Sequence, residues 1–346
     1  MAAFKEGKQV GYDAIVVGCG LAGGVIARHL AEQQGKRVLI LERRGHIAGN
    51  LYDEQDENGI MVQKYGPHSF HTKEKRLFDY VSQFGEWEPY YLRCMVFMDG
   101  RFTPSPFNFQ TIDDFCEPEE AARLKRHLAA AFPGRDRATI VEMLKAEDAL
   151  VAKFARFLFE KDYSLYTAKQ WGISPQKIDI SVLERVPVVF SYQDKYFNDA
   201  YQVMPKGGFT RFYQRLIDHP GIQVQLNIDA RAHLSIKDEK IWMDGRPIDI
   251  PVVYTGPIDE LLNGKYGYLP YRSLRFEYRT EPVDSYQAAP IVAYPQAEGY
   301  TRITEYTKLP EQMGRGKTVI AVEYPLQYQE DKGIEPYYPI LTEEGH

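Results

Sequence analysis

The chain has 346 residues, of which 44% are hydrophobic and 26% are charged, and its formal net charge is -6. This length suits two or three domains with a large core, and the acidic balance argues against a general nucleic-acid binder, so phosphate recognition would need locally placed arginines. Three scattered cysteines without a C-x-x-C spacing fit neither a disulfide framework nor a zinc site. Because the sequence lacks both a signal-peptide core and a run of about 18 apolar residues, we expect a cytoplasmic protein without a membrane span.

Residues 13–50 predict a dinucleotide-binding unit. An apolar strand precedes a G-x-G-x-x-G turn formed by Gly18, Gly20 and Gly23. Such a turn brings backbone N–H groups against a pyrophosphate at the start of a helix. A second strand ends at Glu42, which is placed to bind a ribose 2′-hydroxyl, and an acid there favours FAD or NAD over NADP. The alternative is a structural turn that binds no ligand.

The pattern after this unit is first mixed and then helical. Residues 60–65 predict a short strand, and residues 113–172 follow a helical period. Thr139 and Glu142 have the spacing of a capping box. We therefore expect an inserted helical domain.

Beyond residue 181 the pattern is typical of strands. Residues 222–228 alternate between apolar and polar side chains, and a hairpin turn is expected at 244–245. A Gly-Gly pair opens an amphipathic helix within 204–217, and 252–259 predicts a buried strand that runs into a turn. These patterns indicate a mixed or antiparallel sheet.

Seven further strings of residues sharpen the interpretation. In chain order they are ERRGHIAGN (42–50), KYGPHSFHT (64–72), YTAKQWG (166–172), YTGPID (254–259), YRSLRFE (271–277), YTRITEY (300–306) and PYYPI (336–340). Together they closely resemble bacterial UDP-galactopyranose mutases. They occur in the order that this family shows, and YTAKQWG together with YRSL is far more specific than a glycine turn.

The resemblance implies an α/β fold of three parts. These are a Rossmann-like FAD-binding domain (1–85 and 204–262), a helical substrate-binding domain with a mobile loop (86–180) and a twisted antiparallel β-sheet domain (181–203 and 263–346). The implied reaction interconverts UDP-galactopyranose and UDP-galactofuranose with reduced FAD, as in cell wall polysaccharide biosynthesis. Flavin N5 would attack galactose C1 and UDP would leave. We also expect a homo-oligomer.

The resemblance also implies the substrate residues. Arg185 and Arg302 match arginines that bind the diphosphate, and Tyr166 matches the tyrosine that packs on uracil, since a flat base needs an apolar face. Tyr163 and Trp171 would extend this shelf, although the family usually has Phe near Tyr163. Hydroxyls around the phosphates and the sugar would come from Tyr196, Tyr324 and Tyr337. Arg185, Arg302 and Tyr337 are expected to be catalytic, together with His71, which matches a residue of the loop beside the flavin.

On the cofactor side, His68 and His71 match a loop beside the flavin ring. Two histidines without a cysteine or carboxylate cluster make a poor metal site, so we expect no metal. Arg272 in YRSL matches an arginine that lines the flavin and substrate pocket, although Arg275 lies close by. Around the cofactor we expect Gly18, Gly20, Gly23, Glu42, Asn50 and one of Arg43 and Arg44, of which Arg44 fits the ERR tail better.

Three departures from the family pattern stand out. Ala48 replaces a glycine, which matters only if that position needs a positive φ. Ala293 replaces an expected asparagine near the sugar. The sequence ends at LTEEGH, where the family continues into a glycine- and tyrosine-rich segment, so we expect a chain that lacks this segment and its flavin and substrate contacts. The alternatives are an FAD-dependent amine oxidase or desaturase and an inactive flavin-fold module.

Overall fold

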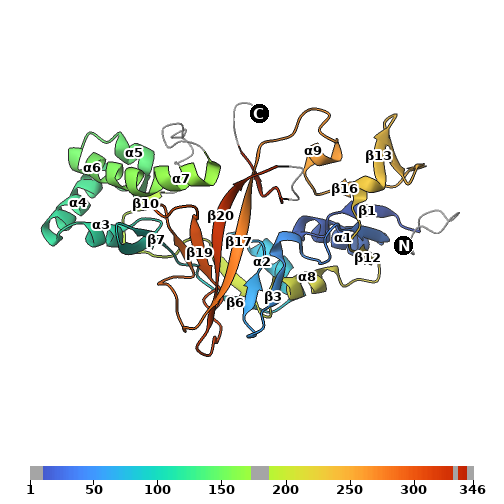
Figure 1. Ribbon diagram of the computed structural model, residues 1–346, viewed down its shortest axis with the longest axis horizontal. Coiled ribbons are helices and arrows are strands. Elements are labelled where there is room, and N and C mark those ends of the chain that lie inside the picture. The colour runs from blue at the N-terminus through green and yellow to red at the C-terminus, as the bar shows by residue number, and fades with distance from the viewer. Residues whose placement is uncertain (1–10, 173–186, 330–333, 341–346) are drawn as a thin grey trace.

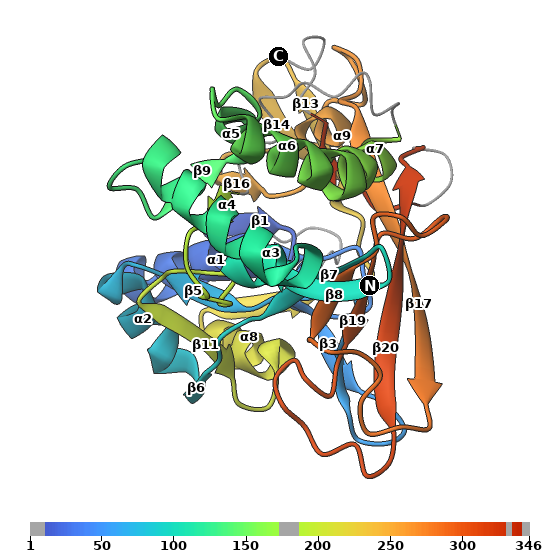
Figure 2. The same cartoon turned by 90° about the vertical axis from the view of Figure 1, so that its left-hand side faces the viewer.

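The computed structural model describes residues 11–172, 187–329 and 334–340. A Rossmann-like part and a helical part lie at opposite ends of the molecule (Figure 1). Between them stands a twisted sheet with the long strands β17 (Tyr271–Glu281) and β20 (Thr318–Gln327). Figure 2 views the molecule from the helical end, with the long strands at one edge. The predicted α/β fold class is confirmed.

The Rossmann-like part is built on a parallel sheet with the strand order β12-β2-β1-β16. The first two strands in the chain, β1 and β2, have the sequences AIVV and VLIL and are buried throughout, as expected for parallel strands covered on both faces. Alternate residues of β1 face opposite sides. Ala14 and Val16 pack toward helices α1 and α8, whereas Ile15 and Val17 pack toward a small antiparallel sheet. The elements are β1 (Ala14–Val17), α1 (Leu21–Gln34), β2 (Val38–Leu41), α8 (Phe209–Ile217), β12 (Ile222–Gln225), β13 (Leu234–Lys237), β14 (Lys240–Met243), β15 (Arg246–Ile248), β16 (Val252–Tyr254) and α9 (Ile258–Leu261).

The hairpin turn expected at 244–245 is confirmed between β14 and β15. Asp244 and Gly245 both have positive φ, at 49° and 76°, as a two-residue hairpin turn of the primed type requires. Further short elements lie outside the parallel sheet. They are β3 (Asp53–Gln55), β4 (Met61–Gln63), β5 (Phe70–Thr72), α2 (Lys75–Val81), β6 (Trp87–Pro89), β11 (Tyr201–Pro205) and three 3-10 turns at Gly49–Leu51, Ser82–Phe84 and Ala230–Ala232.

The helical part has its own apolar core, in which Leu124, Leu128, Val151 and Leu158 are fully buried. The predicted capping box is confirmed, because the Thr139 hydroxyl accepts from the Glu142 backbone while the Glu142 carboxylate accepts from the Thr139 N–H. The elements are α3 (Phe109–Phe115), α4 (Pro118–Ala131), β9 (Arg137–Thr139), α5 (Ile140–Leu144), α6 (Ala149–Leu158), a π-helical turn (Phe159–Tyr163), α7 (Ser164–Trp171) and β10 (Pro187–Val189).

The central sheet has seven strands in the order β21-β17-β20-β19-β18-β7-β8 and is antiparallel except for the β18–β7 pair. Its remaining strands are β7 (Cys94–Met98), β8 (Arg101–Ser105), β18 (Ile291–Ala293), β19 (Arg302–Glu305) and β21 (Tyr338–Pro339).

The described strands depart from the predicted domain boundaries in two places. β7 and β8 belong to the central sheet, although they fall within 86–180, the range expected to be helical. Within 181–203, β10 pairs with β9 of the helical part, and β11 pairs with β5 and with β6, which itself falls within 86–180. The physical reason is that these pairings join segments far apart in sequence, which local periodicity does not encode.

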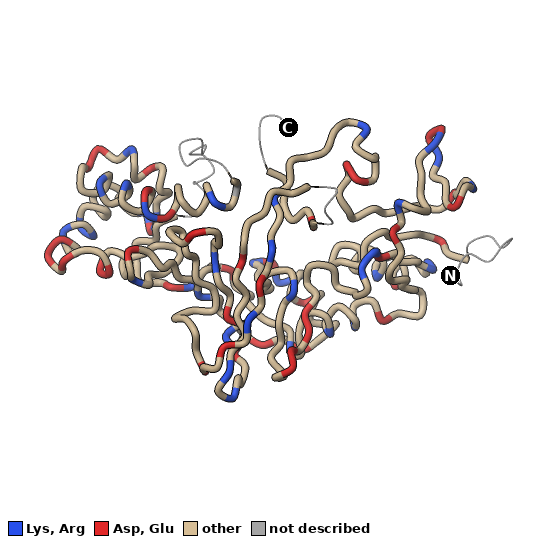
Figure 3. Tube along the Cα trace, viewed as in Figure 1, with Lys and Arg blue, Asp and Glu red and all other residues tan. Residues whose placement is uncertain are grey.

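Charged residues of both signs are interspersed along all three parts (Figure 3). No helix among the described residues is long and apolar enough to cross a membrane. Binding of an anion therefore has to be argued from individual side chains at particular sites.

Candidate active site

The glycine turn adopts the close-packed geometry that its spacing predicts. Gly18 has a φ of 103°, and a Cβ there would lie 2.2 Å from the Thr255 hydroxyl. A Cβ on Gly23 would lie 2.0 Å from the Gly18 carbonyl oxygen. Gly20 is the N-cap of α1 and offers no side-chain cap, so the first N–H groups of a 14-residue helix face an anion site.

Glu42 fixes this turn to the end of β2. Its buried carboxylate accepts from the backbone N–H groups of Cys19, at 2.7 Å, and Arg44, at 2.8 Å. A cavity of about 440 Å³ opens beside the turn and is lined by Gly18, Gly20, Glu42, Arg43, Arg44 and Asn50 among others. A bare helix N-terminus, a carboxylate with remaining lone pairs and arginines around one cavity fit the pyrophosphate and ribose of a dinucleotide.

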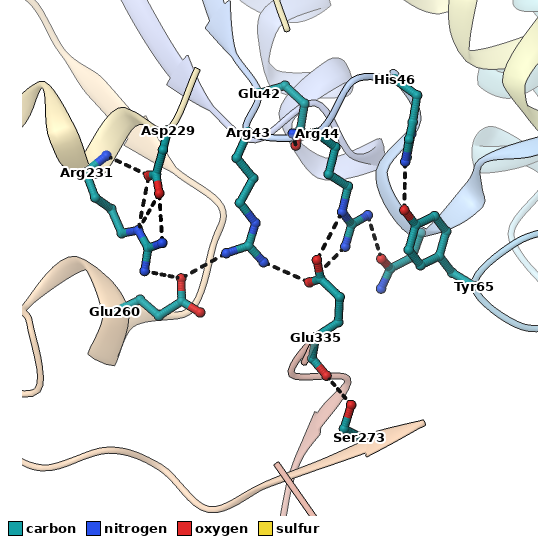
Figure 4. A network of polar contacts seen from close by, with 11 residues as sticks. Glu42, Arg43, Arg44, His46, Tyr65, Asp229, Arg231, Glu260, Ser273 and Glu335 are labelled. Atoms are coloured by element: carbon teal, nitrogen blue, oxygen red, sulfur yellow. Dashed lines mark hydrogen bonds and ion pairs between the residues drawn. The ribbon is translucent and has the colours of Figure 1, made fainter. Parts of the chain in front are cut away.

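An ion-pair network forms one wall of this cavity (Figure 4). Glu335 lies between Arg43 and Arg44, at 2.8 and 3.0 Å, and Arg43 also pairs with the buried Glu260. Arg231 reaches the same Glu260 carboxylate at 3.0 Å. The network ties the segment after residue 333 to the cofactor part.

Within this network, Arg44 is the more closely tied to the predicted set, because its guanidinium donates to Asn50 at 3.0 Å. Arg43 also lines the cavity, so both arginines lie beside the expected cofactor site.

The departure at Ala48 falls where backbone geometry matters. Ala48 has a φ of 72° and is fully buried, and it directly precedes Gly49 with a φ of 57°. A left-handed conformation costs a residue with a Cβ about 1 kcal/mol relative to glycine. The replacement therefore places a strained residue at the rim of the cofactor cavity.

A second cavity, of about 530 Å³, lies where the helical part meets the central sheet. Seven of the predicted site residues line it. They come from β5 and the loop before it, the π-helical turn, α7, the segment between β10 and β11, and strands β17 and β19. They are His68, His71, Tyr163, Tyr166, Tyr196, Arg272 and Arg302. Segments that are far apart in sequence thus converge on one site.

Arg302, the first residue of β19, is held among the described residues through its Nε atom alone. Its Nε donates to the Glu323 carboxylate at 2.7 Å, and Glu323 is almost completely buried. Burial alone would lower the pKa of Arg302, but the Glu323 carboxylate reverses this and raises it above its ordinary value. Within the described chain no group accepts a hydrogen bond from either Nη atom, so these donors are free to bind an anion in the cavity.

Arg272 lines the cavity and is linked to Tyr166 by a relay of side chains. Its Nη1 donates to Gln170 at 2.9 Å, and the Gln170 amide donates to the Tyr166 hydroxyl at 3.0 Å. Tyr338 lies under the guanidinium, 4.7 Å from its centre, and burial lowers the pKa of Arg272. The relay fixes the spacing between a cationic group and the ring of Tyr166.

The two histidines have different environments. The His68 ring is bonded through Nδ1 to the Gly66 carbonyl at 2.9 Å, and burial lowers the pKa of His68, so it is neutral near pH 7. His71 pairs through Nδ1 with Asp199 at 2.6 Å and stacks on Phe197. No group of three potential metal-binding side chains occurs among the described residues.

Other predicted residues lie away from this cavity or outside the description. Arg185 falls outside the described residues, and so does the side chain of Trp171, whose backbone ends α7. Tyr324 stacks against Arg275 on the central sheet, and Tyr337 packs edge-on against Phe276. Neither tyrosine lines the cavity, so the expectation that both surround the substrate stays a prediction.

Sequence reasoning missed Asp162 and Gln170 as lining residues. Gln170 stands inside the YTAKQWG string and could have been chosen for its position. Asp162 directly precedes Tyr163 in the neighbourhood noted as unusual for the family. Ala293 also lines the cavity, where the expected asparagine would have offered a hydrogen bond.

Comparison with known proteins identifies the family. A sequence model of the UDP-galactopyranose mutase family matches residues 161–346, and one described as an NAD(P)-binding Rossmann-like domain matches 16–84. The UDP-galactopyranose mutase of Mycoplasma pneumoniae is 34% identical over 335 residues, which are 95% of this chain and 84% of that protein. The chain belongs to the UDP-galactopyranose mutase family. It is therefore an isomerase of this type.

Other relatives bear on the substrate. A probable UDP-galactopyranose mutase of Klebsiella pneumoniae is 36% identical, over 94% of this chain and 81% of that protein. A dTDP-fucopyranose mutase of Escherichia coli is 32% identical, over 96% of this chain and 86% of that protein. The family thus includes members named for different nucleotides and different sugars.

Solved structures agree on the fold. A reduced UDP-galactopyranose mutase superimposes with a TM-score of 0.64 and 19% identity, covering 92% of this chain and 74% of that one. A putrescine oxidase superimposes with a TM-score of 0.50 and 13% identity, covering 90% and 75%. At these identities the likeness shows the shared fold alone.

Proposed function

We propose that this chain interconverts UDP-galactopyranose and UDP-galactofuranose with reduced FAD. The observation that carries the proposal is the 530 Å³ cavity, in which Arg272 and Arg302 stand beside the ring of Tyr166. Cations and an aromatic face that line one cavity suit the two ends of a nucleoside diphosphate. An amine substrate has no phosphate for the arginines to bind, and this disfavours the amine oxidase alternative.

The roles of the residues follow from their contacts. The free Nη donors of Arg302 bind phosphate oxygens and stabilise the charge that builds up as UDP leaves galactose C1. Arg272 adds a second cation, positioned by Gln170. His68, which stays neutral, offers its imidazole ring on the same wall, whereas its backbone N–H and carbonyl are bonded to the Gln63 side chain. Arg185 and Tyr337 remain candidates by resemblance.

FAD fits the first cavity because its pyrophosphate would meet the bare N-terminus of α1 and its ribose would meet Glu42. The chemistry that reduced FAD supplies when bound is a nucleophilic N5 for displacement of UDP at galactose C1. A cytoplasmic location and a homo-oligomeric state remain predictions.

The test is an anaerobic assay of the flavin-loaded protein with UDP-galactofuranose, with and without dithionite. The proposal expects UDP-galactopyranose to form only after reduction. A parallel aerobic assay with an amine tests the alternative, and oxygen consumption there together with no turnover of the nucleotide sugar would support the oxidase instead. Turnover of dTDP-fucofuranose in preference to UDP-galactofuranose would keep the reaction class and correct the substrate.

A further inference from the structure

One carboxylate that lines the candidate substrate cavity has no role in the proposed mechanism. Asp162 lies in the π-helical turn Phe159–Tyr163 and lines the cavity next to Tyr163. Turns of this kind are rare in proteins, and those that occur are often found at functional sites. The neighbouring Glu160, on the same turn, is exposed to solvent instead.

The Asp162 carboxylate has no hydrogen-bond donor in the described parts of the chain. Lys169 is the cation that acts on it, but the Lys169 ammonium is bound to three backbone carbonyls, those of Tyr294, Ala297 and Tyr300, at 2.6 to 2.8 Å. Burial raises the pKa of Asp162 to about 7, and Lys169 opposes this shift. A partly buried acceptor without a donor is costly, so the site suits a ligand that brings an N–H group.

The direction of the ligand follows from charge. Gln170, which positions Arg272, lies eight residues beyond Asp162, roughly 12 Å along a helix. A diphosphate is attracted to the two arginines, which stay charged, and is repelled by the Asp162 carboxylate whenever that group is ionised. The nucleoside base is therefore expected near Asp162, with Tyr166 between the two ends.

We propose that Asp162 reads the nucleobase by accepting a hydrogen bond from the ring N3–H of uracil or thymine. This inference rests on the proposed function and deepens it, because it assigns a specificity-determining residue to the base end of the site. The imide N–H is the donor that these two bases share in that part of the ring. A base whose N3 carries no hydrogen would leave the carboxylate without its partner.

The experiment is a double-mutant cycle between the protein and the base. Binding of UDP and of 3-methyl-UDP, which lacks the N3–H, is titrated against the flavin-loaded protein and its Asp162→Val and Asp162→Asn variants. The wild type should bind UDP at least tenfold more tightly than 3-methyl-UDP. Asp162→Val should weaken UDP about tenfold and leave the two nucleotides within about threefold, whereas Asp162→Asn should keep part of the preference because its amide oxygen still accepts.

Glu160→Val is the matched control, since it removes an acid from the same turn outside the cavity, and it should leave both affinities unchanged. Flavin content and circular dichroism check that each variant folds. An undiminished preference for UDP in both Asp162 variants would overturn the inference while leaving the proposed function intact. A wild type that bound neither nucleotide would overturn both.

Discussion

Replacing Arg302 by alanine should destabilise the protein through the charge that it leaves behind. The Arg302 guanidinium is the ion-pair partner of Glu323, at 2.7 Å, and the Glu323 side chain is only 3% exposed. Without the arginine, the carboxylate keeps a long hydrogen bond from the Thr301 hydroxyl at 3.4 Å. Breaking a buried pair costs about 3 to 5 kcal/mol, and we expect the lower end because the Arg302 side chain is 27% exposed.

Thermal unfolding of three variants measures this effect. Arg302→Ala should lower Tm by roughly 4 °C, and adding Glu323→Gln should recover about half of the loss, because the buried charge is then removed as well. The control is Arg279→Ala, which breaks an exposed ion pair with Glu277 in the same sheet and should leave Tm unchanged. If the double variant were as unstable as Arg302→Ala, the uncompensated carboxylate would not be the cause.

Three further outcomes are expected. Gly23→Ala should cost roughly 3 kcal/mol or more and abolish flavin binding, because the new Cβ would meet the Gly18 carbonyl at 2.0 Å; a stable, yellow variant would contradict this. Asp53→Ala should lower the free energy of unfolding, measured by chemical denaturation, by about 2 to 4 kcal/mol. The reason is that the N–H groups of Phe209, bonded at 2.6 Å, and of Thr210 lose their acceptor; an unchanged denaturation midpoint would show that Asp53 does not cap α8. The Tm of the wild type should fall relative to Asp162→Asn between pH 5 and pH 7.5. The folded chain keeps a proton on Asp162 up to a pKa of about 7, whereas the unfolded chain releases it near 4, so folding stability declines as pH rises; parallel curves would count against the shift.

The dinucleotide unit could be predicted from the sequence because its signals are local. The turn residues Gly18, Gly20 and Gly23, the two apolar strands and Glu42 all lie within residues 13–50, and each obeys a rule that needs no distant partner. The capping box and the hairpin turn were predictable for the same reason.

The cap of α8 shows what local reading could not supply. Gly208 offers that helix no side chain, and the cap comes instead from Asp53, which is 156 residues away from Phe209 in sequence. The parallel pairing of β7 with β18 was missed likewise. Contacts of this range depend on how whole elements pack, which the periodicity of one segment does not determine.

The candidate substrate site came mainly from resemblance. Arg302 and Tyr166 were chosen because they stand in family strings, and their own surroundings in sequence would have favoured a surface ion pair and a core aromatic. The structure adds the environment, namely the buried Glu323 that fixes Arg302 and the Gln170 relay. Asp162 was not predicted as a site residue, because resemblance assigns no role to a residue that departs from the family pattern.

The central claim is that UDP leaves galactose C1 and is held by cationic side chains until the sugar ring has changed. Positional isotope exchange tests it directly, with UDP-galactopyranose that carries ¹⁸O in the bridge between C1 and the β-phosphorus. The account predicts that the reduced, flavin-loaded protein scrambles the label into the non-bridging β-phosphate positions, and that the Arg302→Ala variant scrambles it far more slowly. Ring contraction in the reduced wild type with the label still wholly in the bridge would contradict the account.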